Sequence, residues 1–438
     1  MVFDLIFGKK KNQPEFPDIS FGRYSDNNKS VARVGSWTSA ELLFTEGRYF
    51  ESIELFFEYL RDDAENNVLF HKDTPSTAHF EIYQGSKIIR GKVNEQGVYA
   101  ETILARMPEP NTPVMRRLLE MNFRLFYSRY ALNGKDLCMC FDSPLETANP
   151  NKLYYGLKEL CVKADKQDDL LIQEFNTLEP VDTRHIEAVP DVEKEIKYRY
   201  YQQWLNTTLE YSNTLDAEKF SGAISYMLLT LVFRIDYLLR PEGRLLSDLE
   251  QVAEKYFSQT GKSAFTRNQE MKEALEKLRE KPRGEVLSGF FRSRYTFSIV
   301  SPVASAKISE NLKQALDNMR WYRDNQHALI ANEVMEYGMA YNQFSYSLAK
   351  PLSALHQVFM QVNHSNFFKD LGFSPAYYDL VKSTFNTEAI TDAIHSIIQS
   401  WKPKYPSLNF NTRKLKFDGL VQFNQSFVEE VSKLKTDL

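Results

Sequence analysis

One change of pattern constrains the fold of this chain more than any other feature: the spacing of its apolar residues switches once, near residue 180. Between residues 77 and 106, apolar and polar residues alternate, as they do in the strands of a sheet with one wet face. Beyond residue 191, apolar residues recur every three or four positions, which is the spacing of amphipathic helices. The pattern predicts an α+β fold, in which an antiparallel sheet domain is followed by an all-α domain.

The domain boundaries follow from the same switch. We expect an N-terminal extension at 1–35, a sheet domain at 36–178, a linker at 179–191 and the all-α domain at 192–438. Prolines interrupt both spacings within the linker, so limited proteolysis is expected to cut there first.

Within the sheet domain, the predicted order is helix, three strands, helix, two strands, helix. Thr38 starts a capping box for the first helix. Thr112-Pro113 has the composition of a helix N-terminus. Asn133-Gly134 joins the predicted strands 124–132 and 136–141, and this dipeptide between alternating runs is the strongest short hairpin signal.

This element order resembles the YbjN family and the fold that it shares with type III secretion chaperones. The resemblance covers roughly residues 36–178. The segment from Arg116 to Asn122, through the hairpin to Leu153 and Ala164-Asp165, also reads like a YbjN core. The resemblance implies a binding or regulatory module, usually dimeric, in which helices cover one sheet face and partner segments lie on exposed apolar surface. No catalytic motif belongs to that fold, so no site residues carry over.

The all-α domain is predicted to be an irregular helical bundle, because its prolines are too unevenly spaced for a repeat array. The predicted helices are 192–212, 216–239, 245–259, 269–280, 307–323, 329–348, 352–362, 376–384, 388–401 and 417–435.

Charge and cysteine content bear on partners and compartment. The formal net charge of -4 lacks the basic excess that nucleic-acid binding requires, so nucleic acid is not an expected partner. Cys138, Cys140 and Cys161 cannot form a disulfide framework, and the N-terminus does not read as a secretory signal. The most apolar helical stretch, from Ile224 to Leu239, carries Arg234 and Asp236 and falls short of the ~20 residues of a membrane span. We therefore expect a cytoplasmic protein without a membrane span.

Local motifs for catalysis are incomplete. Gly261-Lys262-Ser263 resembles the end of a phosphate-binding loop, but Tyr256 stands where that loop needs glycine. His79-Phe80-Glu81 begins a zinc deaminase signature whose paired cysteines are missing. Three histidines follow an aspartate by three, a spacing that is also found in di-metal bundles, at Asp182/His185, Asp324/His327 and Asp392/His395. Capping and surface pairing explain these pairs as well. We predict no metal and no cofactor, so that chelation should leave the melting temperature unchanged.

The function expected from these observations is non-catalytic binding of another protein chain or of a second copy of this one. The predicted partner-binding residues are Tyr83, Arg90, Tyr99 and Tyr130, because the strand alternation places them on the mixed face of the sheet, and tyrosine and arginine are enriched in interfaces. The alternative is that the helical domain covers this face within the protein.

The alternative is an enzyme of unknown class with a polar site in the helical domain. It would lie around Arg234, Trp321, Glu333 and Glu336. Arg234 lies in the most apolar helix, so it should reach an acid on another helix. Asp236 and Arg240 are spaced to pair with each other along that helix.

Overall fold

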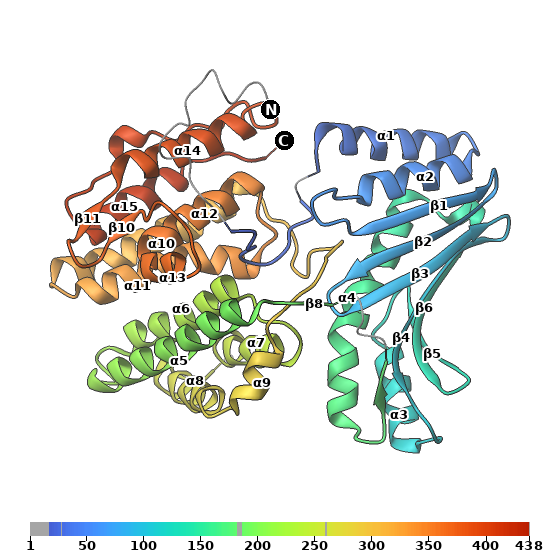
Figure 1. Cartoon of the computed structure of the whole chain (residues 1–438), viewed down its shortest axis with the longest axis horizontal. Coiled ribbons are helices and arrows are strands. Elements are labelled where there is room, and N and C mark those ends of the chain that lie inside the picture. The colour runs from blue at the N-terminus through green and yellow to red at the C-terminus, as the bar shows by residue number, and fades with distance from the viewer. Residues whose placement is uncertain (1–16, 28, 182–185, 259–260, 438) are drawn as a thin grey trace.

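The computed structural model describes residues 17–27, 29–181, 186–258 and 261–437. Figure 1 shows two halves beside each other: a sheet with helices packed on one of its faces, and a larger assembly of helices. The predicted α+β class, with the sheet in the N-terminal part, is confirmed.

Two helices precede the sheet. Helix α1 (Val31–Thr45) begins seven positions before the predicted capping box, because the side chain of Ser30 accepts a hydrogen bond from the backbone N–H of Arg33. Helix α2 (Tyr49–Leu60) follows after Gly47, whose φ of 78° is a conformation that favours glycine. Part of the predicted N-terminal extension is therefore helical.

The main sheet is antiparallel, with the strand order β1-β2-β3-β4-β6-β5. Its strands are β1 (Val68–Thr74), β2 (Thr77–Gln84), β3 (Lys87–Asn94), β4 (Gly97–Arg106), β5 (Arg129–Asn133) and β6 (Asp136–Pro144).

Two predictions about these strands need correction. Four strands, not three, precede α3 (Thr112–Asn122), because β1 forms an additional edge strand whose polar C-terminal half shows no alternation. The fifth strand begins at Arg129 and not at Arg124, since the residues before it form a turn whose backbone N–H groups bind the side chain of Glu159. The hairpin at Asn133-Gly134 is confirmed.

The core of the sheet half lies between the inner sheet face and α4 (Pro150–Glu174), with α2 beside it. Leu153, Leu157 and Leu160 recur along one side of α4 and are fully buried. Burying each such side chain stabilises the fold by roughly 1.5–3 kcal/mol. Gly156 lets this helix approach the strands, because a Cβ there would lie 2.3 Å from the ring of Phe141.

The helical half is built around α6 (Ser221–Leu239), most of whose residues are buried. The other helices are α5 (Asp191–Thr214), α7 (Gly243–Phe257), α8 (Ala264–Arg279), α9 (Arg283–Ser288), α10 (Ser305–Asp324), α11 (Ala328–Ser345), α12 (Lys350–Asn363), α13 (Ser365–Asp370), α14 (Thr387–Trp401) and α15 (Leu420–Val431).

Helix α6 alone, among the described residues, is long and apolar enough to cross a membrane, but 89% of its most apolar stretch is buried inside the protein. Helix α6 is therefore a core helix of the helical half. The helix predicted at 376–384 is wrong: the chain there forms two short strands, β10 (Tyr378–Asp379) and β11 (Thr384–Phe385), which pair with each other.

The two halves are joined by more than the linker. The two ends of the linker form short strands. Strand β7 (Glu179–Pro180) pairs with β4, and β8 (Glu187–Ala188) pairs with β9 (Phe291–Arg292). Phe297 crosses from the helical half into the core of the sheet half, where it is fully buried. The side chain of Gln84 donates to the carbonyl of Phe297 and accepts from its N–H, which fixes this crossing segment against β2.

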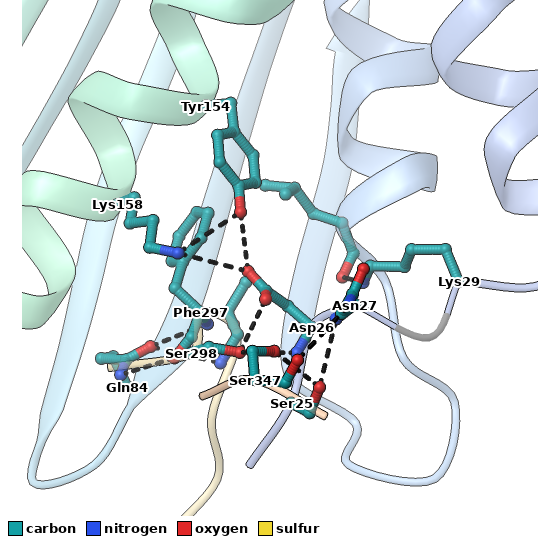
Figure 2. Close-up of polar contacts among 12 residues, drawn as sticks. Ser25, Asp26, Asn27, Lys29, Gln84, Tyr154, Lys158, Phe297, Ser298 and Ser347 are labelled. Carbon is teal, nitrogen blue, oxygen red and sulfur yellow. Dashed lines mark hydrogen bonds and ion pairs between the residues drawn. The ribbon is translucent and has the colours of Figure 1, made fainter. Parts of the chain in front are cut away.

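A polar network closes the same junction (Figure 2). Asp26 accepts hydrogen bonds from the hydroxyl of Ser298 at 2.6 Å and from that of Tyr154 on α4 at 2.8 Å. Ser347, after α11, contacts both Ser25 and Ser298. The N-terminal segment thus ties the helical half to the sheet half.

Candidate functional site

Three of the four predicted partner-binding residues lie on the outer face of the sheet, which no helix covers in Figure 1. Arg90 is exposed and forms an ion pair with Glu81 at 3.0 Å. Tyr99 is half-buried and donates its hydroxyl proton to Glu101 at 2.5 Å, and burial with this bond raises the pKa of Tyr99. Polar side chains of the outer face therefore pair with one another, as they do on a solvated sheet face.

Tyr83 and Tyr130 are not exposed on the outer sheet face, as a partner-binding role there would require. Tyr83 lies on the outer face but is only 8% exposed, because Arg294 from the helical half covers its ring. Tyr130 pairs with Met139 and points to the inner face, where it joins the core at 7% exposure. The predicted strand parity of Tyr130 is wrong, because its pairing with the buried Met139 of β6 turns its side chain to the inner face. The binding role of the outer face itself stays a prediction.

A group of exposed apolar side chains lies elsewhere, on the end of α3 and the turn between α3 and β5. The exposed fractions are 95% for Phe123, 90% for Phe126, 70% for Leu119 and 43% for Tyr127. We call these four residues the α3–β5 surface. Val114 and Leu118 hold α3 onto the core, and this orientation turns Leu119 outward. The sequence analysis missed this surface, although Phe123 and Phe126 flank Arg124 within one short apolar stretch.

The turn that carries these rings is fixed. Glu159 of α4 accepts hydrogen bonds from the backbone N–H groups of Phe126, Tyr127 and Ser128 at 2.7–2.9 Å. Partial burial opposes ionisation of Glu159, but the three N–H donors outweigh it and lower its pKa. The carboxamide of Asn122 bonds to both the N–H and the C=O of Tyr130. The exposure of the two phenylalanines is therefore built into the fold.

A cavity of about 670 Å³ opens beside this surface, between α3, the turn, β5 and α4. Its lining combines apolar side chains with three basic residues and one acid, and consists of Arg117, Leu119, Glu120, Met121, Phe123, Arg124, Leu125, Tyr130, Lys163 and Gln167. The combination suits a ligand that presents apolar groups together with negative charge.

A second cavity, of about 250 Å³, lies between α4 and α7 at the junction of the two halves. Asp165 and Glu242 line it. Burial raises the pKa of both carboxyl groups, and for Asp165 the neighbouring Asp168 and Glu242 raise it further. Both carboxyl groups already accept hydrogen bonds, Asp165 from Ser86 and Glu242 from the hydroxyls of Ser293 and Tyr295.

The predicted polar site of the helical domain is partly assembled. Arg234 binds Glu336 at 2.6 Å and Glu333 at 2.9 Å, both on α11, so the expected acid on another helix is confirmed. Trp321 lies apart, half exposed at the end of α10. Asp236 binds Arg23 of the N-terminal segment, so the predicted pair with Arg240 is wrong.

In the cluster around Arg234, each carboxylate oxygen of Glu333 and Glu336 has a hydrogen-bond partner. His364 completes it by contacting Glu336 at 3.0 Å. Burial disfavours ionisation of Glu336, but Arg234 and His364 outweigh this and hold its pKa below the ordinary value. Because the carboxylate oxygens of both glutamates already have partners, the cluster reads as a buried structural network.

The aspartate–histidine pairs form no metal centre in the part of the chain that the structure describes, where no group of three or more potential ligands comes together. Asp182 and His185 lie outside the described residues. His395 contacts the hydroxyl of Thr412 at 3.1 Å. Metal independence stays a prediction.

No protein-family model and no curated protein matches this chain.

Proposed function

We propose that this protein is a non-catalytic binding protein that holds another polypeptide at the α3–β5 surface. The observation that carries the proposal is the near-complete exposure of Phe123 and Phe126 on a turn that Glu159 and Asn122 hold in place. Burying a phenylalanine side chain contributes roughly 1.5–3 kcal/mol, so two exposed rings beside a cavity favour an occupied state.

The layering of the sheet half supports the same proposal. Helices cover one sheet face and apolar surface remains exposed, which is what the resemblance to YbjN and to secretion chaperones implies. The bound polypeptide is another protein or a second copy of this chain. We also propose a cytoplasmic location, which the three unpaired, buried cysteines support.

The test is affinity capture from native lysate, followed by mass spectrometry, with the full chain and with the double variant Phe123→Asp, Phe126→Asp. Both side chains are exposed, so the variant should fold and keep its melting temperature while losing its captured partner or its self-association in light scattering. The matched control is Leu380→Asp, Val381→Asp, because these side chains are 47% and 96% exposed in the helical half. Capture and oligomeric state unchanged by the Phe123/Phe126 variant would contradict the proposal.

A further inference from the structure

The lining of the cavity beside the α3–β5 surface is positively charged, whereas the protein as a whole is negatively charged. Its lining carries three basic residues, Arg117, Arg124 and Lys163, and one acid, Glu120, a local excess of two positive charges. The chain as a whole has a formal net charge of -4. A positive cavity on a negative protein favours a ligand with acidic groups.

Two of these cations form no ion pair with any residue that the structure describes. Among the described residues, no carboxylate lies within ion-pair distance of Arg124 or Lys163. Arg117 lies 3.9 Å from Glu120 and 3.3 Å from Glu174, but its Nε forms no hydrogen bond. The cations are therefore available to an acidic ligand without breaking a strong internal pair.

The backbone edge beside the cavity is largely closed to another strand. Strand β5 is at the end of the sheet, and an edge strand normally offers its N–H and C=O groups to a partner. Here Asn122 occupies both backbone groups of Tyr130, and Glu159 occupies the N–H of Ser128. This partial occupation of the edge favours a ligand that binds through its side chains, as a helix does, over one that adds a strand.

We infer that the occupant of the α3–β5 surface is an amphipathic helix whose apolar face is bordered by acidic residues. Its apolar side chains would pack on Leu119, Phe123 and Phe126, and its carboxylates would face Arg124 and Lys163. The inference rests on the proposed function, and it adds the conformation and the charge of the bound segment.

The probe is a fluorescein-labelled synthetic peptide of 18 residues, about five helical turns, with leucine and phenylalanine on one face and glutamate along both borders. A second peptide carries lysine in place of every glutamate. A third has the acidic composition with prolines inserted, so that it stays extended. Fluorescence anisotropy with the full-length protein should show binding of the acidic helix, with the other two peptides at least about tenfold weaker.

The charge contact is tested by Arg124→Glu, Lys163→Glu. This variant should bind the acidic helix about tenfold or more weakly and gain affinity for the lysine peptide. The matched control is Lys313→Glu, Lys435→Glu, which makes the same change in net charge at two exposed positions of the helical half. The control should bind all three peptides as the unmodified protein does.

Failure of this inference can be told apart from failure of the proposed function. Equal binding of the acidic and basic helices would overturn the charge assignment, and preference for the proline peptide would overturn the helix. Absence of binding to every peptide, with cellular partners still lost in the Phe123/Phe126 variant, would overturn the acidic helix while the binding surface stands. If the Phe123/Phe126 variant kept its cellular partners, both the acidic-helix inference and the proposed function would be contradicted.

Discussion

The guanidinium carbon of Arg294 lies 3.5 Å from the centre of the Tyr83 ring. Arg294 follows β9 in the helical half, and its carbonyl accepts a hydrogen bond from Gly85 at the end of β2. The contact places a cation of one half over the outer sheet face of the other. Tyr83 is therefore part of the junction between the halves, and it is unsuitable as a probe of an open sheet face.

The outer sheet face is better tested through Tyr99. We expect Tyr99→Asp combined with Arg90→Glu to leave the captured partners and the oligomeric state unchanged, because binding is proposed at the α3–β5 surface. Circular dichroism establishes that the variant is folded, and affinity capture reads the outcome. Partners lost in this variant but kept in the Phe123/Phe126 variant would instead make the sheet face the binding surface.

The network around Asp26 should contribute measurably to stability. Asp26→Ala removes acceptors from the hydroxyls of Ser298 and Tyr154 at a buried junction, so we expect a loss of about 2–4 kcal/mol in the free energy of unfolding. Urea unfolding followed by tryptophan fluorescence measures it. The control is Asn27→Ala, an exposed neighbour with one long bond to Ser347, for which a change within about 0.5 kcal/mol is expected. Equal effects would show that the network does not stabilise the junction.

Limited proteolysis should cut first between Leu178 and Asp191. The pairings of β7 and β8 hold the two ends of this stretch, and residues 182–185 lie between them. The cleaved fragments should still elute together from a sizing column, because Phe297 and Gln84 join the halves independently of the linker. First cleavage inside either half, or separation of the fragments without denaturant, would contradict this account.

Two buried histidines should contribute a loss of stability in mild acid, because burial disfavours their charged forms. Burial lowers the pKa of His356 to about 3 and also lowers that of His364. The unfolded chain takes up protons near pH 6.5 while the folded protein does not, so stability is full above pH 6.5 and declines below it. The decline for His356 is about 1.4 kcal/mol per pH unit down to about pH 3.

His356→Phe tests this directly. The ring of His356 stacks on Tyr237 at 4.3 Å, and phenylalanine can keep that contact while removing the titrating group. Urea unfolding at pH 7, 6 and 5 should show a smaller decline than in the unmodified protein. His395→Phe, at an exposed position of α14, should leave the decline as it is. An unchanged decline in His356→Phe would refute the assignment.

Local sequence signals account for much of the fold. Alternation predicted β2, β3 and β4, Asn133-Gly134 predicted the last hairpin, and helical spacing predicted most of the second half. These elements carry their own signal, because a half-buried strand or helix must alternate apolar and polar residues in its own period. Strand β1 escaped prediction because its exposed end carries no such period. The segment 376–384 was assigned the wrong element because a short apolar stretch fits either period.

The candidate site was decided by tertiary structure. Nothing local to Phe123 and Phe126 tells whether their rings are buried; Glu159, more than thirty residues away, fixes the turn that exposes them. In the same way, Tyr130 lies in the core because it pairs with Met139 of β6, whose side chain faces inward. The sequence determined by itself where strands and helices can form, since backbone period and turn chemistry act between near neighbours. Which faces stay open depends on contacts between residues far apart in the chain, and those exist only once the elements have packed.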